Sequence, residues 1–307
     1  MHFEKSPTTI DEQLILLKER GMQIPDENHA SRCLEAIGYY RLSAYWLPLE
    51  IPSETAQTRS KRFQEGANFE KAFELYVFDR RLRVLLLEAI ERIEIHIRSR
   101  WTFRMVHSHG THAHLDHRLY SGGLNHAEQL LRLARSVDRS EETFVLHYKN
   151  KYTVPFSPPL WAATELMTLG ELSKWFKATK DNTIKSAVAR DLGLPSRESA
   201  EGAFQVLSYV RNICAHHGRL WNRRLVKRVP WIRRFQDDIL REEGAERNQP
   251  ANTIYNVLVV VVHILHVQNT GTTFPARLRT LVESVDDETR VAMGFPSDWR
   301  ERPVFNL

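Results

Sequence analysis

Residues 68–107 read NFEKAFELYVFDRRLRVLLLEAIERIEIHIRSRWTFRMVH, and this stretch decides the fold class. Its apolar side chains recur every three or four residues, which places them on one face of a helix. The positions on that face are Leu75, Phe78, Leu82, Leu85, Leu86, Ala89, Ile93 and Ile97. The stretch therefore predicts one long amphipathic helix.

The segments on either side of this helix also have helical periodicity, and no segment alternates as a strand does. TIDEQLILLKERG predicts a helix that ends at Gly21, and a second helix follows Asp26. Further helices are predicted over residues 123–138, 140–149, 181–192, 197–217, 231–243, 250–268 and 273–285, with two short ones in 158–179 separated at Gly170. We expect an all-α protein with an N-terminal helical lobe over residues 1–60 and a main helical bundle over residues 61–307.

The composition is that of a soluble globular protein with a mild excess of positive charge. The 307 residues carry a formal net charge of +5, which is weak evidence for a polyanionic partner. The position of the charge is more informative, because no Asp or Glu occurs between residues 211 and 235. The eight cations in that interval are Arg211, Arg219, Arg223, Arg224, Lys227, Arg228, Arg233 and Arg234.

Cysteine content and hydropathy predict a cytoplasmic protein without a membrane segment. Cys33 and Cys214 are far apart and lack metal-ligand spacing, which fits a reducing cytosol. The first residues contain no apolar signal core. The run IYNVLVVVVHILHV, residues 254–267, is shorter than the roughly 20 residues that span a bilayer, so we interpret it as a buried core helix.

The stretch RNICAH, residues 211–216, brings an arginine and a histidine together at the end of a predicted helix. RNA can be cut without a metal ion when its 2′-OH attacks the adjacent phosphate. This reaction needs proton transfer, which histidine can perform near neutral pH, and a fixed cation for the transition state, which arginine can supply. An Arg-x4-His pair therefore provides both ingredients.

The spacing of this pair has a geometric consequence. Five residues advance a helix by about 500°, so Arg211 and His216 project roughly 140° apart. One copy of the pair also supplies one imidazole for two proton transfers. Both points favour a site that a second copy completes across a two-fold interface. Gly218 is predicted to end the helix, with Asn212 and His217 as the nearest auxiliary groups.

The bare pattern has a competing structural interpretation. Arg211 could form an ion pair in the core, and His216 could be a hydrogen-bonded residue at a helix end. The same pattern occurs a second time as RMVHSH, residues 104–109, with different neighbours. The pattern alone therefore does not decide between catalysis and packing.

The wider sequence resembles a known family. RNICAHHGRLWNR is similar to the motif of the HEPN superfamily, and specifically of the Abi-like (AbiD/AbiF-type) abortive-infection proteins. RGMQIPDENHASRCLEAIGYYRLSAYWLP resembles that family's N-terminal signature, and YVFDRRLRVLLLEAIERIEIHIRS resembles its long helix. FVLHYKNKY and PPLWAATELMTLGELSKWF are similar to its middle segments, so the resemblance spans about residues 10–225.

The resemblance implies a HEPN-type helical bundle, a homodimer, and a metal-independent endoribonuclease used in phage defence or toxin-like growth arrest. Arg211, Asn212 and His216 occupy the family's catalytic positions, with His217 beside them, and no cofactor is implied. Some relatives are thought to associate with a small structured RNA. The basic stretch that could accommodate such an RNA contains Arg219, Arg223, Arg224, Lys227 and Arg228.

Glu94 and Arg98 stand four residues apart on the long helix and can form an ion pair. One interpretation is a solvated surface pair, which contributes only a few tenths of a kcal/mol. The other is that Glu94 orients Arg211 from the facing helix, as the resemblance suggests.

Two further segments carry weaker signals. HSHGTHAHLDH, residues 107–117, is rich in histidine, but it has neither thiolates nor helical metal-ligand spacing, so we expect a polar loop and no metal. GYYRLSAYW, residues 38–46, offers aromatic rings that could stack on bases, with Arg41 as a candidate phosphate contact. Aromatic residues in helices more often belong to the core.

The sequence leaves two other functions open. A non-catalytic RNA-binding module would use the Arg/His pair only to hold a helix end or to grip a phosphate. A protein-interaction or antitoxin-like helical partner would not need RNA at all. RNA cleavage in EDTA distinguishes the nuclease from both.

Overall fold

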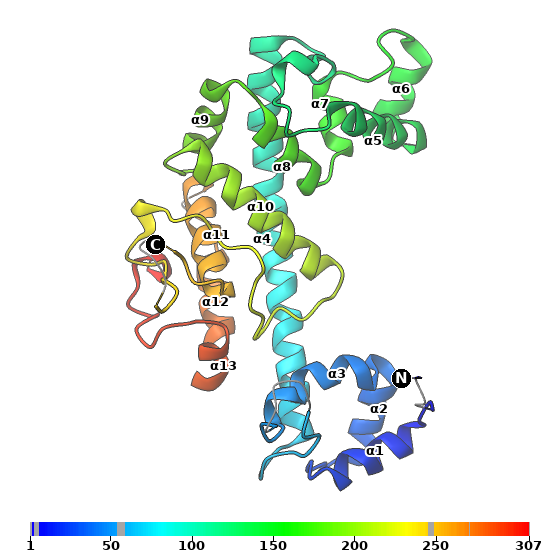
Figure 1. Cartoon of the computed structure of the whole chain (residues 1–307), viewed down its shortest axis with the longest axis vertical. Helices are drawn as coiled ribbons and strands as arrows, with labels where there is room; N and C mark the ends of the chain where they lie inside the picture. The colour runs from blue at the N-terminus through cyan, green and yellow to red at the C-terminus, as the bar shows by residue number, and fades with distance from the viewer. Residues whose placement is uncertain (1, 3–5, 54–58, 245–248, 270, 307) are drawn as a thin grey trace. The chain divides into compact units, whose positions relative to one another are not determined.

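The computed structural model describes residues 2, 6–53, 59–244, 249–269 and 271–306 (Figure 1). The chain forms two compact units, Met1–Leu82 and Arg83–Leu307. Within the described residues the regular secondary structure is helical and no strand occurs, so the all-α prediction is confirmed. The predicted lobe boundary near residue 60 stays a prediction.

The first unit contains three short helices and the start of a long one. These are α1 (Ile10–Glu19), α2 (Glu27–Ile37), α3 (Tyr39–Trp46) and the first part of α4 (Phe69–His109). Asp26 caps α2 through the backbone N–H of His29, as the sequence predicts. Gly38, with a φ of 90°, separates α2 from α3. In the core of the unit, the buried Tyr45 hydroxyl donates to the Asp79 carboxylate at 2.7 Å.

The long helix α4 confirms the main prediction from the sequence. It runs for 41 residues, and all eight apolar positions predicted to share one face are buried. A periodicity near 3.6 residues keeps these side chains on one face, where other helices exclude water from them. The prediction held because the periodic pattern is long.

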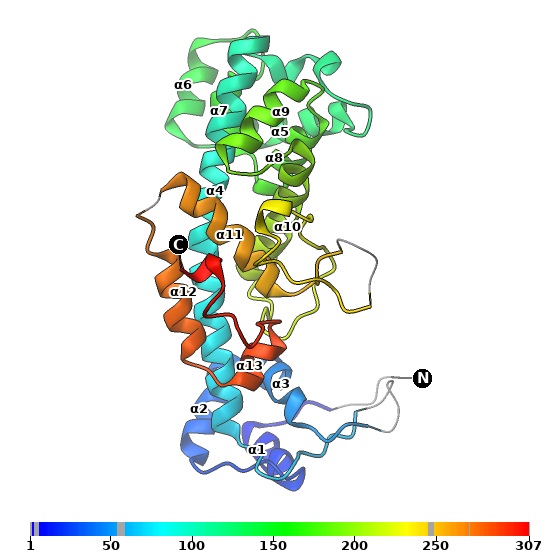
Figure 2. The same cartoon turned by 90° about the vertical axis from the view of Figure 1, so that its left-hand side faces the viewer.

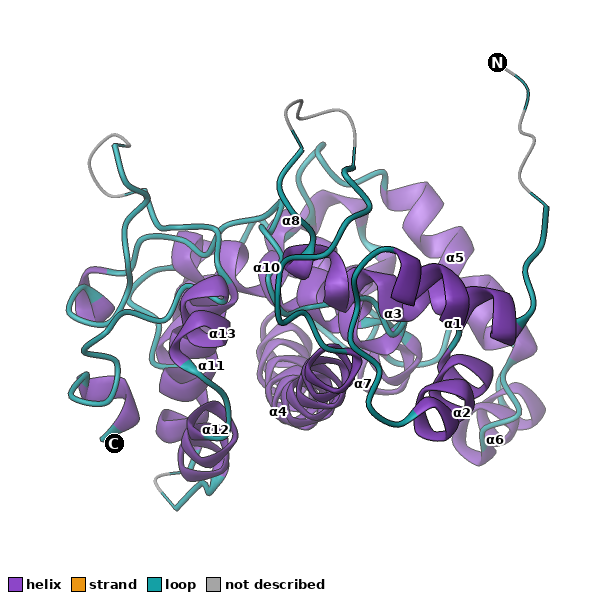
Figure 3. Ribbon diagram, turned by 90° about the horizontal axis from the view of Figure 1, so that it is seen from below, coloured by secondary structure: helices purple, strands orange, loops and turns teal. Residues whose placement is uncertain are grey.

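The second unit contains the rest of α4 and the remaining helices. These are α5 (His126–Arg139), α6 (Thr143–Lys151), α7 (Leu160–Ala163), α8 (Leu169–Ala178), α9 (Asn182–Asp191), α10 (Arg197–Ala215), α11 (Ile254–Gln268), α12 (Phe274–Glu283) and α13 (Asp287–Ala292). Helix α10 packs against α8, α9 and α11, and α11 also packs against α12. Figure 3 looks along α4 and shows α11 and α12 on one side of it, with α8 and α10 on another. Figure 2 shows α11 and α12 beside the same helix.

The apolar helix α11 is a core element, as predicted. Its residues from Ile254 to Val262 are all buried, together with Ile264 and Leu265. Of the helices that the structure describes, none combines the length and the hydropathy that a bilayer crossing requires.

The structure corrects one predicted helix boundary and one predicted helix. The break in residues 158–179 falls at Thr168 rather than at Gly170, because Thr168 and Glu171 form a capping box that starts α8. The helix predicted over residues 231–243 is wrong, since only the short turn Arg233–Phe235 is helical there.

Backbone groups of residues 231–243 form hydrogen bonds with side chains outside that segment. The Asn256 side chain binds both the N–H and the carbonyl of Leu240 at 2.8 Å, and the Tyr255 hydroxyl donates to the Asp238 carbonyl at 3.0 Å. These side chains of α11 satisfy groups that a continuous helix would pair internally. Apolar periodicity therefore did not produce a helix here.

Candidate functional site

Helix α10 carries the Arg-Asn-x3-His motif at its C-terminal end. The helix begins after Ser196, whose hydroxyl accepts a hydrogen bond from the backbone N–H of Ser199 at 3.1 Å. Buried apolar side chains then hold the helix against α8 and α9. In the last turn Arg211 is half-buried, whereas Asn212 and His216 are exposed. The motif is therefore held by a rigid helix and remains open to solvent.

The end of α10 has the hydrogen bonds of a Schellman motif. His216 is the C-cap residue, and His217 adopts a left-handed backbone with a φ of 57°. The N–H of Gly218 donates to the Ile213 carbonyl at 2.8 Å, and that of His217 to the Cys214 carbonyl at 3.1 Å. The left-handed residue thus comes one position before the predicted terminator Gly218. Gly218 is needed for space instead, since a Cβ there would lie 3.3 Å from Ile213 Cγ2.

Arg83 of α4 holds this helix end from outside. Its Nη1 donates to the His217 carbonyl at 2.6 Å and to the Gly218 carbonyl at 3.2 Å. Arg83 is only 5% exposed, so its charge is held in place by its partners rather than by bulk water. Arg83 was not among the site residues predicted from the sequence. Its signal was the arginine-rich stretch DRRLR on an otherwise apolar helix face.

Arg211 projects from α10 towards a charged cluster on α4. Burial raises the pKa of Glu94 above its ordinary value, and the charges of Arg98 and Arg211 act in the opposite direction. Glu94 forms its ion pair with Arg98, at 2.8 Å, and both side chains are 13% exposed. The pair is therefore mostly buried and is not the solvated surface pair that the sequence left open.

Arg211 itself keeps its guanidinium largely uncommitted. Its Nη1 donates to the Asn212 side-chain oxygen at 3.5 Å, which is long for a hydrogen bond. Among the described residues no carboxylate lies within 4.0 Å of it. A half-buried cation next to exposed polar groups can therefore still accept an anionic ligand.

The second Arg-x4-His pattern in the chain provides an internal comparison. Arg104 forms an ion pair with Asp191 at 2.7 Å, and His109 contacts Asp181 at 3.1 Å. Both members of that pair are thus engaged with carboxylates of the fold. The same spacing serves packing in one place and remains open in the other.

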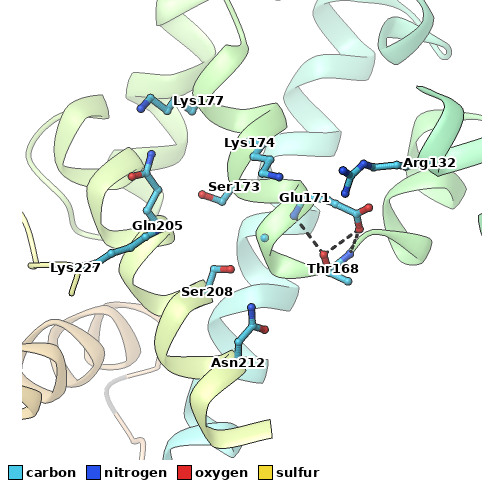
Figure 4. A pocket seen from close by; sticks show the side chains of 11 residues that line it. Arg132, Thr168, Glu171, Ser173, Lys174, Lys177, Gln205, Ser208, Asn212 and Lys227 are labelled. Carbon is cyan, nitrogen blue, oxygen red and sulfur yellow. Dashed lines mark hydrogen bonds between the residues drawn. The ribbon is translucent and has the colours of Figure 1, made fainter. Parts of the chain in front are cut away.

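Asn212 lines a polar groove between α8 and α10. The cavity has a volume of about 640 Å³. Figure 4 shows Ser208 and Asn212 entering it from α10, and Ser173 and Lys174 from α8. The complete lining is Arg132, Thr168, Gly170, Glu171, Ser173, Lys174, Lys177, Gln205, Ser208, Asn212 and Lys227. Asn212 and Lys227 were predicted from the sequence as site residues, whereas the α8 residues were not, because nothing local in α8 predicts which helix it faces.

The basic stretch after the motif is partly neutralised by a distant carboxylate. Glu242 forms ion pairs with Arg224 and with Arg228, the latter at 3.5 Å. Arg223 is half-buried and Lys227 is exposed, and the described residues offer neither of them a carboxylate partner. Arg219, the remaining predicted contact, is half-buried. The absence of acidic residues from the sequence interval therefore overstates the positive field.

The other residues singled out in the sequence differ in exposure. Arg41 is exposed on α3, in the first compact unit. Of the aromatic residues beside it, Tyr45 and Trp46 are buried core residues, whereas Tyr40 is 92% exposed. Trp221, which follows the motif, is buried and donates to the Thr289 carbonyl at 3.2 Å.

The histidine-rich segment is built into the fold. His114 is fully buried and forms a hydrogen bond with the Ser157 hydroxyl at 2.8 Å. Burial lowers the pKa of His114 to about 3. His126 binds the His114 carbonyl and stacks on Tyr120. In the part of the chain that the structure describes, no three His, Cys, Asp or Glu side chains converge as metal ligands.

The fold and this helix end together define an all-α protein with an open Arg-Asn-x3-His motif. A family model described as Abi-like protein matches residues 32–222, which is more than half of the chain. The chain belongs to the Abi-like family. Membership points to abortive infection, a form of phage defence. Searches of the curated proteins and of the solved structures gave no match.

Proposed function

We propose that the chain is a metal-independent HEPN endoribonuclease of the AbiD/AbiF type, acting in the cytoplasm during abortive infection. One observation carries the proposal. Of the two Arg-x4-His pairs in the chain, the Arg104 pair is engaged with carboxylates, whereas the Arg211 pair is open beside a basic groove. The family assignment supports the biological setting.

Each residue of the motif has a chemical role in this proposal. His216 transfers a proton, either from the attacking 2′-OH or to the leaving 5′-oxygen. The Arg211 guanidinium stabilises the charge that develops on the phosphate in the transition state. Asn212 orients the substrate from the groove wall, and His217 is the nearest auxiliary group.

Glu94 and Arg98 act on this chemistry through Arg211. The Glu94 carboxylate attracts the Arg211 side chain from α4, and its own position is fixed by the 2.8 Å bond to Arg98. The Arg98 Nη2 also donates to the Met167 carbonyl at 3.0 Å, which anchors the pair to the segment before α8. These are positioning residues, since neither would touch the RNA.

We further propose that the active form is a homodimer. The reaction needs two proton transfers, and each copy of the motif supplies one proposed proton-transfer imidazole, that of His216. A second copy would bring another His216 to the phosphate across a two-fold axis. RNA is the proposed substrate, and a small structured RNA is a proposed partner for Arg219, Arg223, Arg224, Lys227 and Arg228, with Arg41 as a further contact.

The test is cleavage of synthetic RNA in the presence of EDTA. Wild type should yield 2′,3′-cyclic phosphate and 5′-hydroxyl ends, because the 2′-OH is the nucleophile. His216→Ala should lose about 10²–10⁴-fold in rate, and Arg211→Ala about 10²–10³-fold. His107→Ala removes an exposed imidazole elsewhere and should cleave like wild type. Cleavage that requires Mg²⁺, or full activity in both motif variants, would overturn the assignment.

The second candidate is a non-catalytic RNA-binding protein of the same defence response. The observation that favours it is the groove itself, which can bind a polyanion whether or not the motif cleaves it. RNA binding without cleavage under any condition would favour this candidate over the first.

A further inference from the structure

The groove beside Asn212 continues into a second hollow along α8. The second hollow has a volume of about 570 Å³ and shares Lys174, Lys177 and Gln205 with the first. Its other lining residues come from the segment before α5, from α5 itself and from α8, α9 and α10. The two hollows therefore form one continuous depression in the second compact unit, with α8 along its length.

Three carboxylates line this depression, and two of them are ion-paired. Glu171 accepts hydrogen bonds from Thr168 in the capping box of α8. Glu128 is paired with Arg132 at 2.6 Å, and Glu201 with Lys185 at 2.9 Å. Among the described residues, Glu171 is the one of the three that has no cation within 4.0 Å.

Among the described residues, three cations that line the depression have no carboxylate partner. Lys174 and Lys177 lie one turn apart on α8, and Lys227 reaches the groove from the loop after α10 (Figure 4). Within the described ranges, none of the three has a carboxylate oxygen within 4.0 Å. Three lysines against the one carboxylate of Glu171 leave the depression with a net positive charge, which attracts a polyanion.

The α10 wall of the groove leads to the motif. Gln205, Ser208 and Asn212 follow each other at spacings of three and four residues, so they share one face of the helix. His216 follows Asn212 by four residues, which rotates it by only about 40° and advances it by about 6 Å. A chain bound along this wall would therefore arrive at His216.

The neutral lining indicates which part of the ligand is held. Ser173, Ser208, Gln205 and Asn212 offer hydroxyl and amide groups that can bind sugar hydroxyls and phosphate oxygens. None of the residues lining either hollow is aromatic, so stacking on bases is not provided. Gly170 keeps the wall open, since a Cβ there would lie 3.1 Å from the Ser208 hydroxyl. The lining therefore suits the sugar–phosphate backbone of a nucleic acid rather than particular bases.

We infer that this depression binds the sugar–phosphate backbone of single-stranded RNA, with Lys174, Lys177 and Lys227 on its phosphates, and guides the strand to His216. The inference rests on the proposed function in taking RNA as the ligand. An unpaired strand is required because attack by a 2′-OH needs its phosphate to turn in line, which a duplex resists. Grip on the backbone makes binding tolerant of sequence.

The experiment measures binding separately from cleavage. The full-length chain carrying His216→Ala is titrated with a labelled oligouridine, by fluorescence anisotropy over a series of salt concentrations. Adding Lys174→Gln and Lys177→Gln should weaken binding at least tenfold at low salt. The slope of log affinity against log salt should fall by about 1.4, because each phosphate contact on a single strand contributes about 0.7. Lys227→Gln should lower the slope by about half as much.

A matched control removes two charges elsewhere in the same unit. Lys149→Gln with Lys151→Gln changes exposed residues of α6 and should leave affinity and slope nearly unchanged. In the cleavage-competent chain, the α8 double variant should raise KM and leave kcat within about twofold, because the lysines hold the strand outside the reacting phosphate.

The outcomes separate this inference from the proposed function. If the α8 double variant binds like the α6 control, or if a duplex binds as tightly as the single strand, the groove assignment is overturned even when cleavage is observed. If binding depends on the lysines but no RNA is ever cut, the groove assignment stands and the nuclease proposal fails.

Discussion

The Arg83 guanidinium donates to the His217 carbonyl across 2.6 Å, joining residues 134 positions apart in the sequence. This bond, with the second one to Gly218, fixes two carbonyls of the turn that follows α10. His216 is the residue immediately before the clamped carbonyl. The orientation of the proposed proton-transfer group therefore depends on a side chain that does not reach the substrate.

Arg83→Lys should lower kcat with little change in KM. A lysine keeps the charge but replaces the planar fork by one ammonium group, so the two carbonyls are held less rigidly. The loss of a hydrogen bond from a buried charged group should also lower the free energy of unfolding by about 1.5–3 kcal/mol. Steady-state kinetics and urea denaturation measure the two effects. Arg81→Lys, at an exposed position on the same helix, is the control, and equal kcat values for both variants would refute the clamp.

The raised pKa of Glu94 predicts how stability depends on pH. The ordinary pKa of a glutamate side chain is 4.5, and burial holds the pKa of Glu94 above it in the folded state. A group with a raised folded-state pKa contributes stability below its unfolded-state pKa and loses it as the pH rises through the folded-state value. The stability of wild type relative to Glu94→Gln should therefore decline as the pH rises above the ordinary glutamate pKa and through the higher folded-state pKa of Glu94.

Two measurements check this prediction for Glu94. Urea denaturation of both proteins across the pH range gives the difference in free energy of unfolding. An NMR titration of the side-chain carboxyl carbon, assigned by comparison with the Gln variant, gives the pKa itself. A pKa below the ordinary glutamate range would contradict the burial argument.

Neutralising Glu242 should strengthen RNA binding. Glu242 pairs with Arg224 and Arg228, so Glu242→Gln would free both guanidiniums for phosphates. Affinity for an RNA hairpin should rise several-fold at low salt, and the salt slope should increase by about 1 to 2. The adjacent Glu243→Gln makes the same change in net charge at an exposed position and should have a much smaller effect. Equal gains in both variants would mean that net charge alone is responsible.

If two copies complete the active site, cleavage should depend on protein concentration. The rate per protomer should fall on dilution below the dissociation constant of the dimer, because each isolated protomer lacks the second imidazole. Analytical ultracentrifugation gives that constant independently. A rate per protomer that stays constant while the dimer dissociates would show that one copy suffices.

The fold followed from the sequence wherever one face of a helix is apolar over many turns. The eight predicted positions on α4 are all buried. Their burial could be predicted because each additional helical turn repeats the same apolar signal. Over residues 231–243 the apolar side chains Ile232, Phe235 and Ile239 are buried as a helical pattern suggests, but side chains of α11 take the backbone hydrogen bonds. Such partners are distant in sequence and are not visible in a local pattern.

The candidate site divides along the same line. Arg211, Asn212 and His216 are neighbours on one helix, so their spacing could be read directly. Arg83 is separated from them by most of the chain, and the groove lysines of α8 come from another helix. The charge of the site is equally hard to predict locally. Residues 211–235 contain no acidic residue, yet Glu242, which lies outside that interval, forms ion pairs with Arg224 and Arg228.

The Schellman end of α10 also affects how the protein should respond to heat. Helix termini fray before helix centres, and His216 lies at such a terminus, held by the Ile213 and Arg83 bonds. Warming should loosen this turn while the buried centre of α10 remains helical. Catalysis should therefore be lost several degrees below the melting temperature of the fold, and should return on cooling.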